Sequence, residues 1–332
     1  MARRVVCLGE IMLRLEAPAH QRLLQSPAFE ASFGGSEANV AVSLASFGMP
    51  ARFVSALPAN ALGDAALAEL RRFGVDVSQV VRSGERVGIY YLEAGSNQRP
   101  SKVIYDRAGS SAALADASLF DWSAIFADAG WLHVSGITPA LSETAAALTL
   151  EACRQAKRHE LRISCDFNHR AGLWRYGRSA PEVMTPIVGI VDVGIGNASN
   201  CRESLGIEAE NLESLAKKVA ARFPNLSMLA LTSRESRSAD RHGWSACLFS
   251  EGRLIDGPKY EITDIVDRVG AGDGFAAGLI YGLDRYGDAA RALRFATAAG
   301  CLKHTIPGDF NRVGAAEVEA LMDGRASGRI ER

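Results

Sequence analysis

The chain lacks the sequence signals of several protein classes. Its six cysteines stand singly with no C-x-x-C pair, which in a chain of 332 residues favours reduced thiols over a disulfide frame or a zinc site. No apolar stretch reaches the roughly 18 residues of a membrane span. The apolar run after the basic start ends at Glu10, too soon for a signal peptide. The net charge of −1 offers no basic surface for nucleic acid. We therefore expect a cytoplasmic protein that binds small molecules, and neither nucleic acid nor membrane.

Two kinds of catalytic motif are also missing. No G-x-x-x-x-G-K-[ST] sequence occurs, which excludes a Walker-type phosphate loop. No residues suggest a Ser/His/Asp triad or a metal-ligand cluster, and His133 lies in an apolar run that predicts a packed core histidine. Nucleotide phosphates, if bound, must be held in another way.

The order of apolar runs predicts an α/β fold. β-rich runs alternate with helical patterns along most of the chain, which indicates crossover connections and a mostly parallel sheet with helices on both faces. We expect one domain over residues 1–325. Ligands gather at the carboxyl ends of parallel strands, so the polar residues that follow the runs should form one rim. These are Asp166, Asn197, Thr232 and the turn over residues 267–275.

One segment breaks this alternation. Val87–Glu93 and Lys102–Asp106 read as two strands joined by a loop that contains Gly95 and Pro100. Together with possible strands at 10–15 and 28–33, this insertion over 87–106 predicts a small β lid above the rim, although a plain edge hairpin is the alternative. A lid leaves sheet edges open, and a second copy would cover them. We therefore predict a homodimer or higher homo-oligomer through the lid.

The most informative segment is the turn from Asp267 to Asp273. A Gly-x-Gly turn between an extended run (Ile262–Val266) and a helical one directs free backbone N–H groups at one point, at the positive end of the helix dipole. A carboxylate such as Asp273 would be repelled from a bound phosphate unless it takes a proton from a hydroxyl during transfer. The turn therefore predicts a phosphotransferase site. A dinucleotide-type G-x-G-x-x-A match, ending at Ala277, and a purely structural helix start are the alternatives.

Two further groups of residues point to the second ligand. Gly34 and Gly35 precede a helix that carries Asn39, and this arrangement suits close approach of a ligand and an amide directed at sugar hydroxyls, or simply a turn. Arg107 ends the predicted hairpin, and Arg170 follows the strand Arg162–Asp166. Guanidinium groups match carboxylates and phosphates, so these arginines favour an anionic substrate. Helix capping or surface ion pairs are the alternative.

Taken together, these motifs resemble the ribokinase-like sugar kinases, the PfkB family, from about Val5 to about Leu321. The resemblance implies a ribokinase-like α/β fold with a β-strand lid. Further stretches are similar to the 2-keto-3-deoxygluconate kinases of that family, among them Tyr105-Asp106-Arg107, Asp166-x-Asn168-x-Arg170 and Lys303-His304-Thr305. Arg268 stands where most other members carry Thr. The carboxylate of 2-keto-3-deoxygluconate agrees with the anionic substrate expected from the arginines.

The resemblance also implies roles for individual residues. Asp273 would be the general base, the N–H groups of Gly270, Ala271 and Gly272 the anion hole, and Arg170 a further contact of the transferred phosphate. The sugar would be bound by Gly34, Gly35, Asn39, Tyr90, Tyr105, Arg107, Arg170 and Asp273. ATP would be bound by Asn197, Thr232, Ser233, Glu235, Gly270, Gly272, Lys303 and His304.

The implied cofactors are ATP with Mg²⁺, and the sequence leaves open whether a monovalent cation such as K⁺ is also needed near residues 264–270. The family usually shows Asn-x-x-Glu where this chain has Asn197-Ala198-Ser199-Asn200, so Asn200 and Glu203, one turn further on, are the metal candidates. We expect ATP-dependent phosphorylation of the terminal hydroxyl of 2-keto-3-deoxygluconate. The alternatives are a fructokinase or another sugar or sugar-acid kinase, and a sensor that binds both ligands without turnover.

Overall fold

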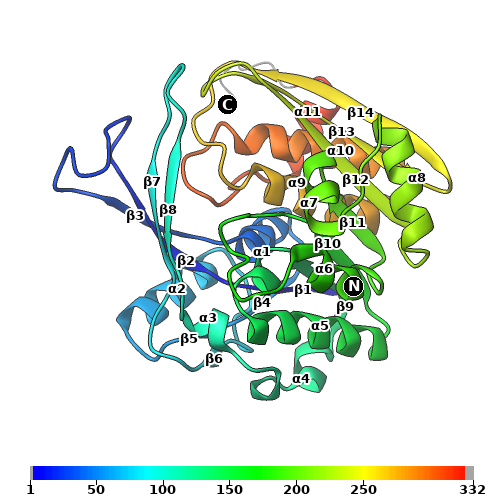
Figure 1. Ribbon diagram of the computed structural model, residues 1–332. Helices are drawn as coiled ribbons and strands as arrows, with labels where there is room; N and C mark the ends of the chain where they lie inside the picture. Colours follow the sequence, from blue (N-terminus) through cyan, green and yellow to red (C-terminus); the bar gives the residue numbers. More distant parts are fainter. Residues whose placement is uncertain (1–2, 326–332) are drawn as a thin grey trace.

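The computed structural model describes residues 3–325 and contains a central eight-stranded sheet (Figure 1). Its strand order is β14-β13-β12-β11-β10-β9-β1-β4. The six strands from β12 to β4 are parallel, whereas β13 and β14 form an antiparallel hairpin at one edge. The strands are β1 (Arg4–Leu8), β4 (Ala51–Val54), β9 (Ala129–Ser135), β10 (Arg162–Asp166), β11 (Val193–Gly196), β12 (Met228–Ser236), β13 (His242–Ser250) and β14 (Arg253–Ile262).

Helices cover both faces of this sheet. Strand residues alternate between the faces, so Val5 and Cys7 join one core and Val6 and Leu8 the other. The first core is covered by α1 (Ser36–Ser46), α2 (Ala61–Arg72), α9 (Ala271–Tyr286), α10 (Ala289–Lys303) and α11 (Ala315–Met322). The second is covered by α4 (Trp122–Phe126), α5 (Glu143–Arg158), α6 (Ala180–Val188), α7 (Ala198–Leu205) and α8 (Leu212–Arg222). A short helix, α3 (Ser111–Leu114), packs against α5.

A second sheet stands beside the main body (Figure 1), and the loop that joins its last two strands contacts the main body, where the N–H of Asn97 donates to Asp240 at 2.7 Å. This small sheet has the order β3-β2-β7-β8, with β2 and β7 parallel and the other two pairs antiparallel. Its strands are β2 (Met12–Glu16), β3 (Glu30–Gly34), β7 (Ile89–Glu93) and β8 (Lys102–Asp106), and a separate pair joins β5 (Ala56–Leu57) to β6 (Val81–Arg82). The predicted α/β architecture with a small β lid is confirmed.

The predicted rim is present, with one correction to the sequence reading. β10, β11 and β12 are neighbours, so Asp166, Asn197 and Thr232 lie along one edge of the sheet. The extended run predicted over 262–266 is wrong as a strand, because pairing with β13 ends at Ile262. Beyond that point the N–H groups of Ile265 and Val266 bond to the loop carbonyls of Asp240 and His304. Within residues 3–325 no helix combines the length and apolarity that crossing a membrane requires.

Candidate active site

The turn before α9 has the geometry of an anion site. Gly270 caps the helix at φ 82°, and a Cβ there would lie 2.1 Å from the carbonyl oxygen of Asp309, so only glycine fits. A Cβ on Gly272 would meet nothing within 4 Å, so space is open beside the turn. Of the predicted anion-hole donors, the N–H of Ala271 bonds to the Arg268 carbonyl at 3.4 Å. Within residues 3–325 the N–H groups of Gly272 and Asp273 have no backbone partner outside the helix. These donors stand at the positive end of a 16-residue helix.

Asp273 lies in this first turn and is held at both oxygens. Oδ1 accepts a hydrogen bond from Ser36 Oγ at 2.8 Å, and Oδ2 accepts one from Asn39 Nδ2 at 2.7 Å. Burial raises the pKa of Asp273, while the hydrogen bonds from Asn39 and Ser36 oppose that rise. A carboxylate with a raised pKa is a better acceptor for a hydroxyl proton. Ser36 was not predicted, although it lies one residue after the glycine pair.

The glycine pair and Asn39 serve this base through protein contacts. The Oδ1 atom of Asn39 accepts the N–H of Gly35 at 3.2 Å, so both ends of the amide have protein partners. A Cβ on Gly34 would lie 2.0 Å from Oδ2 of Asp309, and one on Gly35 2.0 Å from the carbonyl oxygen of Glu10. The glycines are thus required by the approach of other protein segments. Their predicted contact with the sugar stays a prediction.

Three predicted sugar contacts gather on the small sheet. Tyr105 is 43 % exposed, and its ring centre lies 5.9 Å from that of the buried Tyr90 and 5.5 Å from the Arg107 guanidinium. Arg107 is buried and paired with Glu10, whose Oε2 accepts its Nε–H at 2.7 Å. The charge of Arg107 is therefore already compensated by the buried carboxylate of Glu10, and this pair was not predicted.

Among the acids of residues 3–325, Arg170 has no ion-pair partner, unlike Arg107. Its side chain is exposed, and none of the described residues offers it a carboxylate at ion-pair distance. Burial and the neighbouring Asp273 carboxylate raise the pKa of Asp166 to about 7, and the positive charge of Arg170 opposes this rise. Arg170 also opposes the rise at Asp273, so its charge acts on both acids.

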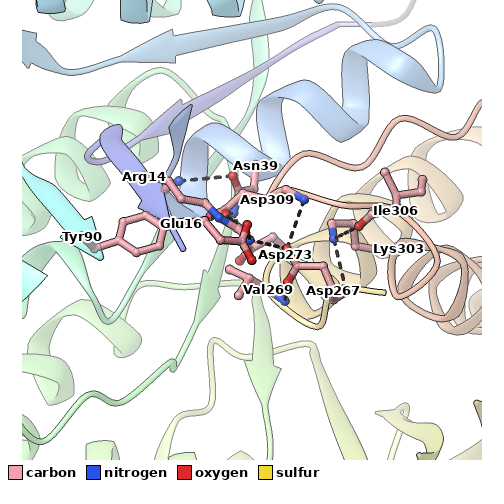
Figure 2. A network of polar contacts seen from close by, with 12 residues as sticks. Arg14, Glu16, Asn39, Tyr90, Asp267, Val269, Asp273, Lys303, Ile306 and Asp309 are labelled. Atoms are coloured by element: carbon pink, nitrogen blue, oxygen red, sulfur yellow. Dashed lines mark hydrogen bonds and ion pairs between the residues drawn. The ribbon is translucent and has the colours of Figure 1, made fainter. Parts of the chain in front are cut away.

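A buried ion cluster adjoins the turn, and its main members were not predicted (Figure 2). Arg14 on β2 pairs with Asp267 and Asp309, each at 2.6 Å. Asp309 Oδ1 also accepts the hydroxyl hydrogen of Tyr90 at 2.5 Å. Tyr90 therefore has a protein partner in addition to the sugar contact predicted for it.

The comparison with known families decides the identity. The sequence model of the pfkB family carbohydrate kinases matches residues 2–311. The chain belongs to this family. It is 45 % identical to the solved 2-dehydro-3-deoxygluconokinase of Thermotoga maritima, with a TM-score of 0.93, covering 97 % of this chain and 100 % of that one.

Two other relatives are a sugar-acid kinase and a fructokinase. The 2-dehydro-3-deoxygalactonokinase of Haloferax volcanii is 33 % identical over 332 residues, 99 % of each chain. A fructokinase of Xylella fastidiosa, solved with bound ATP, shares the fold at 22 % identity and a TM-score of 0.82, over 98 % of this chain and 99 % of that one. The predicted family and enzyme class are confirmed, and the protein is a sugar or sugar-acid kinase.

Apart from Gly270 and Gly272 in the turn, the predicted nucleotide contacts of this carbohydrate kinase fall in two groups. Asn197 caps α7 in a reciprocal pair with Asn200, at 2.8 and 3.2 Å. Thr232 donates its hydroxyl hydrogen to the Gly196 carbonyl at 3.1 Å, and Ser233 beside it is half-buried. Glu235 is exposed and paired with Lys259 at 2.8 Å. These four lie along β11 and β12, at the rim.

Lys303 and His304 form the second group and lie behind the turn. Both are fully buried. The ammonium of Lys303 donates to the Ile306 carbonyl at 3.0 Å and approaches the Asp267 carbonyl at 3.5 Å (Figure 2). His304 Nε2 lies 2.9 Å from Nε2 of His242, and burial lowers the pKa of His304 to about 3. A contact of either residue with ATP stays a prediction, and the backbone would have to make it.

The metal candidates of the kinase are engaged with protein atoms. Glu203 is exposed and pairs with Arg202 at 2.8 Å, and Asn200 completes the cap of α7. Over residues 3–325 no group of three or more His, Cys, Asp or Glu side chains is placed to hold a metal ion. Mg²⁺ favours phosphate and water ligands with one or two carboxylates, so the residues present fit an ion that ATP phosphates hold and Glu203 at most assists.

Proposed function

We propose that this kinase transfers the γ-phosphoryl group of ATP to the terminal hydroxyl of 2-keto-3-deoxygluconate, giving the 6-phosphate and ADP. The observation that carries the proposal is the environment of Asp273 within residues 3–325: a buried carboxylate of raised pKa, beside N–H groups that have no backbone partner outside the helix and near Arg170, which has no acidic partner there. Base, anion hole and free cation are the three elements that phosphoryl transfer to a sugar acid requires.

In this mechanism Asp273 accepts the proton of the terminal hydroxyl. The hydroxyl oxygen bonds to the γ-phosphorus, the bond to the β-phosphate oxygen breaks, and ADP leaves. Ser36 and Asn39 hold the carboxylate in place, and the N–H groups of Gly272 and Asp273 stabilise charge on the transferred group. Mg²⁺ bound with ATP would neutralise phosphate charge.

The substrate carboxylate is proposed to bind near Arg170. Arg107 is less available because Glu10 already neutralises it, although its position beside Tyr105 suits contacts to sugar hydroxyls. The Thermotoga relative supports a gluconate-derived substrate and the Haloferax relative a galactonate-derived one. Both names describe keto-deoxy sugar acids, which supports the acid class.

The test of this proposal is the identity of the product. ATP and 2-keto-3-deoxygluconate are incubated with the enzyme, and ³¹P and ¹³C spectra locate the new phosphate ester. An ester at the terminal carbon supports the proposal. Phosphate on another carbon, or its release as inorganic phosphate, contradicts it.

We also propose that two copies associate through the small sheet. β8 is an edge strand with all five residues exposed, and its apolar residues Val103 and Ile104 are 40 % and 55 % exposed. An exposed edge strand with apolar side chains favours pairing with another chain.

A further inference from the structure

One buried arginine joins the small sheet to the catalytic end of the main body. Arg14 on β2 has no exposed surface, and its guanidinium donates to three carboxylates (Figure 2). One terminal nitrogen lies 2.6 Å from Asp309, and the other lies 2.6 Å from Asp267 and 2.5 Å from Glu16. The two aspartates are 253 and 295 residues away in sequence. Arg14 therefore links two distant parts of the molecule.

Both aspartates help to build the anion turn. The carboxylate of Asp267 accepts the N–H of Val269 at 2.9 Å and that of Gly308 at 3.1 Å, so it fixes the backbone just before the helix cap. The carbonyl oxygen of Asp309 packs against Gly270, where a Cβ would lie 2.1 Å from it. The start of α9 is thus positioned by the two residues that hold Arg14.

The carboxylate of Asp309 also contacts two neighbouring strands of the lid. Tyr90 on β7 donates its hydroxyl hydrogen to Oδ1, and Gly34 at the end of β3 lies so close that its Cβ would be 2.0 Å from Oδ2. Three strands of the small sheet, β2, β3 and β7, therefore meet at one carboxylate whose backbone touches Gly270. A displacement of the small sheet would be transmitted through Asp309 to the anion turn.

The charges make this link sensitive to loss of the arginine. Burial disfavours the charged guanidinium, but the carboxylates of Asp267 and Asp309 raise the pKa of Arg14 above its usual range. Without the guanidinium, Asp267 and Asp309 would lie close together as like charges in a buried site, and removing one partner of a buried ion cluster is strongly destabilising. Repulsion would act directly on the segments that carry Val269 and Gly270.

We propose that Arg14 is a positioning residue that fixes the lid relative to the anion turn. The lid then covers the sugar in the same conformation in which the anion hole is ordered. The inference rests on the proposed function and adds that phosphoryl transfer needs a fully buried residue that is not among the predicted sugar and ATP contacts. Loss of this fixed position would shift the reacting groups. A displacement of about 1 Å can lower a rate on the order of a hundredfold.

The test compares Arg14→Lys with Arg52→Lys. Arg52 is a matched control because it is also buried between two carboxylates, Asp76 at 2.9 Å and Asp128 at 3.0 Å, but it lies on β4 at the opposite, amino-terminal end of the sheet. Both substitutions keep the charge and lose the planar fork, so both should lower Tm. Only Arg14→Lys should also lower kcat, on the order of a hundredfold.

Hydrogen exchange of the amides over residues 266–272, measured without ligand, gives a second readout that needs no activity. Exchange should become faster in Arg14→Lys and remain as in wild type in Arg52→Lys. If Arg14→Lys fails to fold, Tyr90→Phe, which removes only the hydroxyl bond to Asp309, should speed the same amides. Equal Tm losses with unchanged kcat and unchanged exchange at 266–272 would overturn the proposal. An inactive wild type would instead refute the proposed function, and the exchange result would still decide the coupling.

Discussion

Replacing Asp273 with asparagine removes the base and little else. The side chains that hold it can adapt, since Asn39 can donate to the amide oxygen and the Ser36 hydroxyl can rotate to accept from the amide nitrogen. The N–H groups of the turn belong to the backbone and stay in place. The variant therefore separates proton transfer from anion binding.

The expected loss is large in kcat and small in the KM for ATP. General base catalysis contributes about 10²- to 10⁴-fold, which is about 2.7–5.4 kcal/mol of barrier at ~1.36 kcal/mol per tenfold. The pKa of Asp273 is raised by burial, so its negative charge is unfavourable in the folded state at neutral pH. Asp273→Asn should thus have an unchanged or higher Tm at pH above neutrality.

The assay is ADP release coupled to NADH oxidation, with circular dichroism to confirm folding. Glu37→Gln is the matched control, because Glu37 is another buried acid on the same side of the sheet, held by Ser135 and Thr138 and not by the turn. It should keep most of its turnover. A folded Asp273→Asn variant that also keeps most of its turnover would refute the assignment of the base.

Four further predictions follow from the same structure. Arg170→Ala should raise KM for the sugar acid about 10- to 100-fold, as expected for a charged hydrogen bond, and change KM for fructose far less; equal changes would contradict a carboxylate contact. Burial raises the pKa of Glu37 to about 7, so the folded state binds more protons and Tm should fall as pH rises through about 7, less so in Glu37→Gln; a Tm that rises there would be evidence against this. Lys303 already supplies a buried cation to the turn, so ADP release by wild type should not need K⁺. In Lys303→Met the rate of ADP release should be low and should be partly restored by K⁺. ADP release by wild type that depends on K⁺ would exclude this role of Lys303. Ile104→Glu should shift sedimentation from dimer to monomer if the β8 edge is the interface, and a wild-type monomer would rule the interface out.

The features that the sequence predicts well are local. The turn from Gly270 to Asp273 could be identified because glycine conformation, helix N-termini and an acid among backbone donors are all visible within a few residues. The rim could be predicted because alternating strands and helices force parallel strands to end on one side of the sheet.

The features that it did not predict depend on long-range pairing. Glu10 and Arg107 are 97 residues apart, and Arg14 and Asp309 are 295 apart, so no periodicity indicates that they meet. The edge strand β14 (Arg253–Ile262) was not predicted, because its residues are mostly polar and only Ile262 is buried. The short connection at Glu251 and Gly252 is the local sign of its antiparallel hairpin with β13.

The measurement that tests the central claim most directly is kcat/KM for ADP release with ATP and Mg²⁺ on four acceptors: 2-keto-3-deoxygluconate, its galactonate-derived epimer, gluconate and fructose. We predict turnover of the keto-deoxy acids that exceeds turnover of fructose by at least about 10-fold, the contribution expected of one charge-assisted contact. Preferred turnover of fructose would keep Asp273 as the base and contradict the acid site at Arg170. Binding of both ligands without ADP release would contradict the kinase mechanism itself.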